Sequence, residues 1–351
     1  MTNILILITS FSLTAISIFA YLNSSFVSIQ PVSQYLPRHK HKHVPIFGGV
    51  FIAIPFFLIS WRYYFVDLFW LYGVISSAVI IGLSDDILKL KFQNNTGISK
   101  KVKFMMEFIM ILPWVVYKNV TWADFHQFTT FSYSALFDKL NLSILNEGVT
   151  LLAIVLWQSF IILGGINSVN FADGLDGLAI GITLPIAIFL YAIASTALQP
   201  IIIALIGGML GFLIFNLNPA KIFLGEVGPM LIGSFISATA IHLNSEWIFA
   251  FASLVLIIET LSVAAQIISV YIFKKRILYK MPIHHTFEEM IEEKSTVLLF
   301  TTCSILVCFW SLLIYNWWFS AQINTNLFLI YFFIFQFVYI LNIIYAIDDD
   351  K

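Results

Sequence analysis

Long apolar runs recur along the whole chain and constrain its fold more than any other feature. Each run approaches the roughly 20 residues that an α-helix needs to cross a bilayer. The chain holds only 18 Lys and Arg and 19 Asp and Glu among 351 residues, too few to cover a water-soluble globule. Eleven candidate spans fall at about residues 3–22, 46–61, 68–84, 104–118, 148–166, 178–197, 200–215, 227–243, 247–272, 297–318 and 325–346. The sequence therefore predicts an all-α polytopic integral membrane protein.

The rest of the chain favours a single domain. No internal repeat, low-complexity tract or flexible linker interrupts residues 1–351, so we expect one transmembrane domain. The run 3–22 follows no positive charge and precedes no small-residue cleavage site, which favours a spanning helix over a signal peptide. Cys303 and Cys308 share one apolar run, so we expect packing residues rather than a disulfide. The net charge of −1 gives nucleic-acid binding no support.

Lysine and arginine residues set the predicted orientation, because cytoplasmic loops are enriched in them. If the N-terminus lies outside, 15 of the 18 basic residues face the cytoplasm, and the exceptions are Arg62, Lys118 and Lys139. The cytoplasmic segments are then 23–45, 85–103, 167–177, 216–226, 273–296 and the C-terminal tail. These segments also hold the unusual polar clusters of the chain. We therefore expect one composite site in a cleft on the cytoplasmic face.

The first polar cluster alternates basic residues and histidines from Arg38 to His43 and includes Lys42. Gly48 and Gly49 follow, and glycines let a ligand approach the backbone closely. A positive anchor at the membrane surface is one interpretation. Lysines repel a metal cation, so among ligands phosphate suits this cluster better than a metal ion.

The second cluster contains adjacent carboxylates, Asp85 and Asp86, followed by Lys89 and Lys91. Neighbouring carboxylates repel each other and are unfavourable near lipid, so a pair at this depth needs a cation or a proton. Oxygen ligands of this kind suit Mg²⁺, which is commonly shared with substrate phosphates. Helix capping is the simpler alternative for one of the two, but it does not explain both.

The third cluster places polar residues at every third position, at Asn167, Asn170, Asp173 and Asp176, and a glycine follows each aspartate. At this spacing the side chains sweep half the circumference of a helix instead of sharing one face. We therefore expect a helix that ends in a turn, where the last three side chains converge on a ligand. An ordinary Asn/Asp/Gly turn is the alternative.

The fourth cluster comprises Asn216, Phe223 and Glu226, the last of which lies between two glycines. A lone acid at a helix start is equally well explained by the helix dipole.

The fifth cluster contains the neighbouring histidines His284 and His285. Such a pair can hold phosphate, assist acid–base chemistry or bind a metal, and a solvated basic loop is the alternative. Upstream, Glu259 and Gln266 share one helical face, with Glu259 near the predicted middle of the membrane. A buried acid there marks a pore, a relay or a structural network.

These clusters resemble the motifs of one enzyme family. They read G-L-S-D-D-I-L-K, N-S-V-N-F-A-D-G-L-D-G-L-A, F-N-L-N-P-A-K-I-F-L-G-E-V-G-P, and I-E-T-L-S-V-A-A-Q followed by K-R-I-L-Y-K-M-P-I-H-H-T-F-E. In this order, from about Arg38 to Glu288, the chain resembles the polyprenyl-phosphate N-acetylhexosamine-1-phosphate transferases, most closely the translocase I branch. The family usually has ten spanning helices, so the resemblance implies ten or eleven here, depending on the run 325–346.

The resemblance also implies roles for individual residues. The implied catalytic residues are Asp85, Asp86, His284 and His285. The implied Mg²⁺ ligands are Asp85, Asp86 and Glu226. The implied substrate-binding residues are Lys42, Lys89, Asn167, Asn170, Asp173, Asp176, Asn216, Phe223 and Gln266.

Three positions depart from the family pattern. Glu226 stands where the family usually has Asp, Pro229 where it has Ser, and Thr286 where it has the third histidine of a triplet. Glutamate keeps the charge but extends the ligand by one methylene, which alters the geometry of a metal site rather than its ability to bind.

The activity implied by the resemblance is transfer of phospho-MurNAc-pentapeptide from UDP-MurNAc-pentapeptide to undecaprenyl phosphate in the bacterial inner membrane. The products are UMP and lipid I, a peptidoglycan precursor. A sister transferase acting on UDP-GlcNAc is the serious alternative. A secondary transporter, with Glu107, Glu259 and the aspartates as a relay, is a remote one. The third residue of the peptide, the polyprenyl length and a homodimer are left open.

Overall fold

The computed structural model describes residues 2–24, 44–63, 68–92, 97–121 and 147–319. Every regular element in these ranges is helical, which confirms the all-α class for the described residues. The elements are α1 (Thr2–Leu22), α2 (Gly48–Ser60), η1 (Trp61–Tyr63), α3 (Phe69–Phe92), α4 (Lys100–Thr121), α6 (Glu147–Ala172), α7 (Leu178–Ile193), α8 (Gln199–Asn216), α9 (Val227–His242), α10 (Glu246–Ala252), α11 (Leu254–Phe273), α12 (Ile283–Ile291) and α13 (Glu293–Phe319). The predicted run 325–346 lies outside the described residues.

Six helices of the described ranges are long and apolar enough to cross a membrane. They cover Asn3–Leu22, Phe69–Phe92, Gly148–Ala172, Gln199–Asn216, Leu254–Phe273 and Glu293–Trp318. Three shorter apolar helices cover Gly48–Tyr63, Leu178–Ile193 and Val227–His242. The chain is therefore a polytopic membrane protein. Helix α4 contains the predicted run 104–118 but is not among these helices, and its first turns carry Lys100, Lys101 and Lys103.

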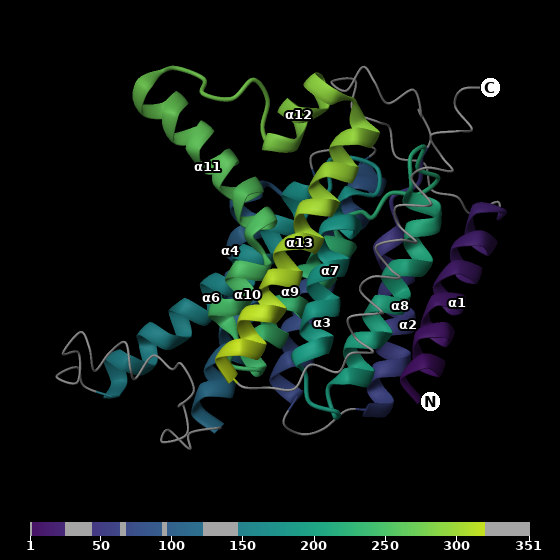
Figure 1. Cartoon of the computed structure of the whole chain (residues 1–351), viewed down its shortest axis with the longest axis vertical. Helices are drawn as coiled ribbons and strands as arrows, with labels where there is room; N and C mark the ends of the chain where they lie inside the picture. Colours follow the sequence, from purple (N-terminus) through teal and green to yellow (C-terminus); the bar gives the residue numbers. More distant parts are fainter. Residues whose placement is uncertain (1, 25–43, 64–67, 93–96, 122–146, 320–351) are drawn as a thin grey trace.

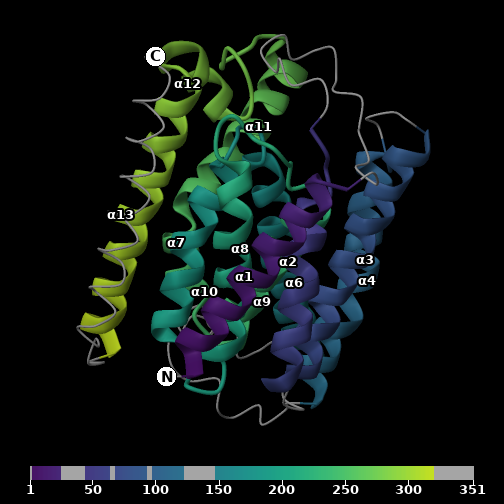
Figure 2. The same ribbon diagram turned by 90° about the vertical axis from the view of Figure 1, so that its right-hand side faces the viewer.

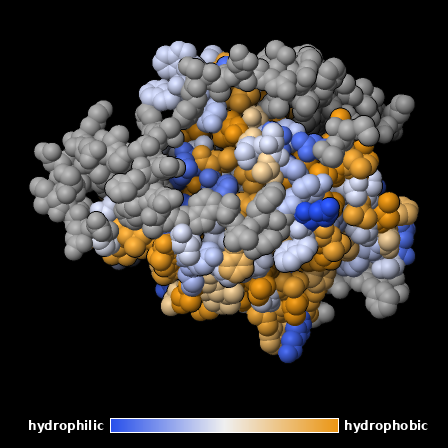
Figure 3. Space-filling view, turned by 90° about the horizontal axis from the view of Figure 1, so that it is seen from below, coloured by the Kyte–Doolittle hydropathy of each residue, from blue (hydrophilic) through white to orange (hydrophobic). Residues whose placement is uncertain are grey.

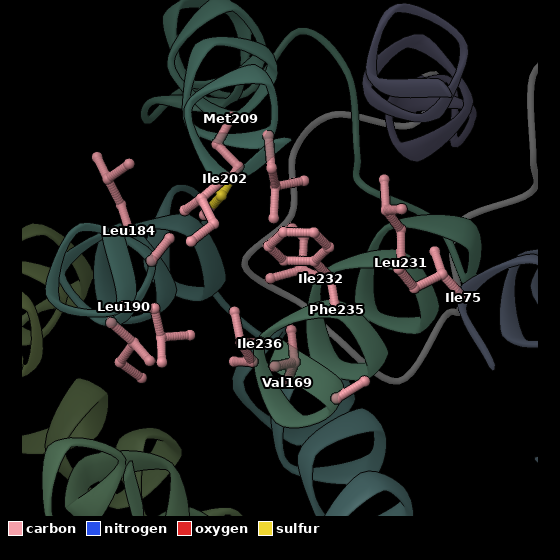
Figure 4. Packing of buried hydrophobic residues seen from close by; sticks show 14 of the residues in the cluster. Ile75, Val169, Leu184, Leu190, Ile202, Met209, Leu231, Ile232, Phe235 and Ile236 are labelled. Atoms are coloured by element: carbon pink, nitrogen blue, oxygen red, sulfur yellow. The ribbon is translucent and has the colours of Figure 1, made fainter. Parts of the chain in front are cut away.

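Helix α9 forms the centre of the bundle. Its residues from Val227 to Ile241 are all buried, and it packs against α2, α3, α6 and α7. Helix α7 is likewise buried along most of its length. A helix that is apolar all round lies inside a bundle rather than at its surface. Figure 4 shows the result, with Phe235 and Ile236 of α9 packed among side chains from the neighbouring helices.

Helix α1 shows the opposite pattern, because it buries a single stripe against α8. The buried side chains are Ile6, Ser10, Thr14 and Ile18, and the Ser10 hydroxyl donates a hydrogen bond to the Ala204 carbonyl at 2.6 Å. The exposed large apolar side chains of α1 are Ile4, Leu5, Ile8, Leu13, Ile16 and Phe19. Such a face suits lipid, and hydrophobic residues also cover much of the described surface seen from below in Figure 3.

The run 247–272, predicted as one span, bends at Ser253 and forms two helices, α10 and α11. The Ser253 amide still donates to the Phe249 carbonyl at 2.8 Å, and the Ile257 amide donates to the Ser253 carbonyl at 2.9 Å. Helical hydrogen bonding thus continues across the bend. The bend contains neither proline nor glycine, so the sequence carries none of the usual signals for it.

The described parts of the predicted cytoplasmic segments 85–103, 167–177, 216–226 and 273–296 lie at one end of the bundle. Helices α3, α6, α8 and α11 end there, and α7, α9 and α13 begin there (Figures 1 and 2). The fold therefore gathers the polar clusters between these helices on one side, although its orientation in the membrane stays a prediction.

Candidate active site

Backbone hydrogen bonds join the start of α2 to the loop between α8 and α9. The Phe223 amide donates to the Pro45 carbonyl at 2.8 Å, and the Gly48 amide donates to the Phe223 carbonyl at 2.9 Å. Gly225 follows with φ +71°. A Cβ at Gly225 would overlap the Ile46 carbonyl and lie 2.8 Å from Asp86 Oδ2. Only glycine suits this position, and it lets the loop pass directly beside Asp86.

Asp86 is buried and caps α9 from the neighbouring helix α3. Its carboxylate accepts the Glu226 amide at 3.0 Å and the Val227 amide at 3.2 Å. The first amides of a helix have no partner within the helix, and an acceptor there also suits the helix dipole. A capping role for one of the two aspartates, the simpler sequence interpretation, thus applies to Asp86, but the helix it caps is α9.

Asp85 and Glu226 meet at Lys89. The Lys89 Nζ lies 2.8 Å from Asp85 Oδ2 and 2.5 Å from Glu226 Oε1. Asn170 donates to Glu226 Oε2 at 2.7 Å, and Lys103 of α4 forms an ion pair with the same oxygen. We call Asp85, Lys89, Lys103, Asn170 and Glu226 the carboxylate hub. It brings side chains from α3, α4, α6 and the α8–α9 loop together.

Two lysines determine the charge state of Glu226. Burial alone would raise the pKa of its carboxyl group, but Lys103 and Lys89 outweigh burial and lower the pKa to about 2. Asp173 lies near the same site, where burial and then the charge of Glu226 outweigh the lowering effect of Lys89 and raise its pKa to about 7. The site therefore holds carboxyl groups with opposite pKa shifts, which is common where phosphate chemistry or proton transfer occurs.

Asp176 and Asn216 form a second polar cluster, which we call the loop joint. Asp176 Oδ2 accepts the Ala220 amide at 2.8 Å. Asn216 Oδ1 accepts the Gly177 amide at 3.0 Å, and Asn216 Nδ2 donates to the Ile222 carbonyl at 2.9 Å. Both side chains are buried. They fasten the 173–177 turn to the α8–α9 loop, and their implied substrate-binding role stays a prediction.

The two histidines lie against the 173–177 turn. His284 is fully buried with Nδ1 2.9 Å from Glu259 Oε2, and His285 Nδ1 lies 3.0 Å from Glu288 Oε2. The ring centroids are 4.3 Å apart. Burial, then the neighbouring His284, lowers the pKa of His285. The structure thus shows Glu259 in a buried contact with His284, and its role as a pore, relay or network residue stays a prediction.

The other residues singled out in the sequence lie around these clusters. Asn167 Nδ2 donates to Glu107 Oε2 at 3.1 Å, one turn below the hub. Gln266 Oε1 accepts the Ile277 and Leu278 amides at 3.0 Å each, so it supports the segment that leads to α12. Phe223 is half-buried in the α8–α9 loop. Lys42, with the rest of the cluster from Arg38 to His43, lies outside the described residues.

Lys103 is the hub residue that sequence reasoning missed. In the sequence, Lys103 counts only among the basic residues that set the predicted orientation. Its position at the start of an apolar helix, four residues before the buried Glu107, is the available signal.

Asp85 and Glu226 suit a divalent cation with oxygen ligands, because both carboxylates approach the single positive atom Lys89 Nζ. In the described ranges, no group of three or more His, Cys, Asp or Glu side chains is close enough to hold a metal ion. Mg²⁺ commonly takes one or two carboxylates and completes its shell with water and substrate phosphates. Two carboxylates are thus sufficient, while Asp86, the third implied ligand, is engaged by backbone amides.

Comparisons with known proteins show to which family the chain is similar. Residues 68–244 match the family described as Glycosyl transferase family 4. The phospho-N-acetylmuramoyl-pentapeptide-transferase of Helicobacter pylori strain J99 is 35% identical over 285 residues, which cover 74% of this chain and 77% of the relative. The protein of the same name from Staphylococcus aureus strain Newman is 38% identical over 214 residues, covering 60% of this chain and 64% of the relative.

Proposed function

The chain belongs to glycosyl transferase family 4, the polyprenyl-phosphate sugar-1-phosphate transferases, and from that premise we propose that its donor is UDP-MurNAc-pentapeptide. A phosphate oxygen of undecaprenyl phosphate would attack the sugar-linked phosphorus, releasing UMP and forming lipid I. The similarity to transferases of that name over about three quarters of the chain carries the proposal. Because the chain belongs to an enzyme family, a secondary transporter is no longer a supported alternative.

The carboxylate hub supports this chemistry. Asp85 and Glu226 would hold Mg²⁺, which would neutralise the charge that develops on the bridging oxygen as UMP leaves. Lys89 and Lys103 lie within the same cluster and would position the anionic phosphates. Asp86 contributes indirectly, because it fixes the start of α9 and with it the backbone of Glu226.

The surroundings of the hub would bind the rest of the donor. His284 and His285 would lie near the diphosphate, with Asn170, Asp173 and Phe223 lining the nucleotide pocket. Lys42 belongs to the proposed phosphate-binding set as well. The lipid tail would lie against the apolar helices, with its phosphate at the membrane surface. We place the site on the cytoplasmic face of the bacterial inner membrane, because UDP-linked sugars are cytoplasmic.

UDP-GlcNAc is the second candidate donor. Thr286 favours it, since it replaces the third histidine expected for the branch that uses the peptide-bearing donor. Its hydroxyl is already bonded to the backbone of Lys280, accepting the amide at 3.1 Å and donating to the carbonyl at 2.7 Å.

The decisive experiment measures UMP release by the purified full-length protein in detergent with undecaprenyl phosphate and Mg²⁺. We expect release from UDP-MurNAc-pentapeptide and little from UDP-GlcNAc, because polar groups that bind the peptide arm stay unpaired with the shorter donor. EDTA should abolish release. Equal or faster release from UDP-GlcNAc would move the chain to the sister activity.

The orientation is tested in cells with single cysteines in a background lacking Cys303 and Cys308. Cysteines at Lys91, Lys221 and Lys280 should resist an impermeant thiol reagent, whereas one at Lys139 should react. Labelling at Lys221 but not at Lys139 would invert the topology and separate the hub from its cytoplasmic donor.

A further inference from the structure

Glu259 and His284 form an ion-pair-like contact that the proposed chemistry has not used. Both side chains are fully buried, and His284 Nδ1 lies 2.9 Å from Glu259 Oε2. The other two polar atoms of the pair, Glu259 Oε1 and His284 Nε2, are buried and have no hydrogen-bond partner among the described residues. An unpaired buried polar atom is unfavourable and requires an explanation, such as a ligand that pairs with it.

The free nitrogen of His284 faces the 173–177 turn. A Cβ at Gly174 would overlap His284 Nε2 and would lie 3.1 Å from His285 Nε2. Gly174 follows Asp173, which the proposed function places in the nucleotide pocket. Both Nε2 atoms are therefore directed at the part of the site where the donor phosphates would lie.

Contacts other than the Glu259–His284 pair bring His284 opposite Glu259. The Ile283 amide donates to Ser262 Oγ at 3.0 Å, and Gln266 accepts two amides of the preceding segment. These contacts hold the start of α12 against α11. They do not decide which imidazole nitrogen carries the proton or which faces the turn, because that depends on the hydrogen bond made by the other nitrogen.

The carboxylate of Glu259 decides which nitrogen of His284 carries the proton, because an ionised carboxylate only accepts hydrogen bonds. We propose that Glu259 is a positioning residue, whose carboxylate holds the Nδ1 proton of His284 and keeps Nε2 directed at the phosphates of the nucleotide sugar. The inference rests on the proposed function for the identity of the ligand. Glu259 contacts His284 rather than substrate, so it acts only through that ring.

A double-mutant cycle separates this role from general support of the bundle. Glu259→Met removes the acceptor at similar volume, and His284→Asn removes Nε2 while keeping a donor near the position of Nδ1. We expect Glu259→Met to lower kcat for UMP release about 10–100-fold, the usual effect of losing a group that orients a site ligand. In the His284→Asn background the same change should alter kcat less than about twofold, because the two residues act as one unit.

Two further variants test whether a loss of activity comes only from misfolding. Glu259→Gln keeps an acceptor oxygen, so its kcat should lie between those of Glu259→Met and the wild type. Glu246→Gln alters another buried carboxylate, at the opposite end of the bundle on α10, and should leave UMP release unchanged. Losses that multiply in the double mutant, or an equal loss in Glu246→Gln, would overturn the inference.

A measurement that needs no enzymatic turnover tests the role of Glu259 independently of which nucleotide sugar is the donor. NMR of full-length protein carrying ¹⁵N-labelled histidine, with the His284 signals identified by their loss in His284→Asn, reports which nitrogen bears the proton. We expect the neutral ring to carry it on Nδ1 in the wild type and to populate both forms in Glu259→Met. A wild-type proton on Nε2 would overturn the inference. Absence of UMP release from any donor, with the proton on Nδ1, would overturn only the proposed function.

Discussion

The carboxylate hub and the loop joint use the same residue types at the same end of the bundle, yet they differ in what those residues contact. In the hub, Glu226 meets Lys89, Lys103 and Asn170, and Asp85 meets Lys89 through Oδ2 while its Oδ1 accepts the Ile98 amide at 2.5 Å. In the joint, Asp176 and Asn216 face backbone amides and carbonyls. Carboxylate oxygens that face lysine side chains can exchange these partners for a substrate and its metal ion. Side chains bonded to the backbone hold loops in place.

Substitutions in the hub should therefore lower the activity while leaving the protein folded. Asp85→Asn removes one of the two carboxylates at Lys89, and we expect UMP release to fall about 100-fold or more, as expected for losing several kcal/mol of charge stabilisation. The thermal unfolding midpoint in detergent should change little. Release near the wild-type rate would remove Asp85 from the metal and phosphate site.

Two substitutions of Glu226 distinguish the effect of its negative charge from the effect of its side-chain length. Glu226→Asp restores the residue usual in the family and should retain most activity, whereas Glu226→Gln should lower it by about 100-fold because the negative charge is lost. If Glu226 merely favoured the start of α9, loss of its charge would change stability by about 0.3–1 kcal/mol and both variants would remain active. Parallel rates of UMP release for the two variants distinguish these outcomes.

Substitutions in the loop joint should lower the stability of the protein more than its activity. Asn216→Ala leaves the Gly177 amide and the Ile222 carbonyl without their partner, and an unsatisfied buried group costs about 1–3 kcal/mol. We expect a lower unfolding midpoint and, per folded molecule, a smaller loss of UMP release than in the hub variants. A large kinetic loss at unchanged midpoint would instead assign Asn216 to substrate binding.

An ion pair at the same end provides the smallest expected effect. Lys280 Nζ lies 2.5 Å from Glu289 Oε1, but the lysine side chain is 48% exposed. Exposed pairs contribute about 0–1 kcal/mol, so Lys280→Met should leave both the midpoint and UMP release close to wild type. A loss comparable with that of the hub variants would mean that Lys280 itself takes part in the reaction.

The sequence predicted the class of fold and the end of the bundle that holds the site, because apolar length and basic residues act locally along the chain. It did not separate Asp85 from Asp86. Adjacent residues on a helix point about 100° apart, so one reaches Lys89 and the other reaches α9, which only the packing of α3 on α9 decides. The pairing of Glu259 with His284 likewise depends on how the segment between α11 and α12 folds back against α11. The spacing of apolar residues does not predict this. Lys103 was missed because its partner, Glu226, is 123 residues away.

The cap that Asp86 places on α9 also limits how the chain can vary in length. Its carboxylate contacts two successive amides, those of Glu226 and Val227, immediately after a glycine that has no space for a side chain. Residues added or removed between Gly225 and Val227 would rotate Glu226 away from Lys89 or detach the helix from α3. An insertion or deletion at this tripeptide should therefore abolish UMP release, because the position of Glu226 beside Lys89 depends on the cap.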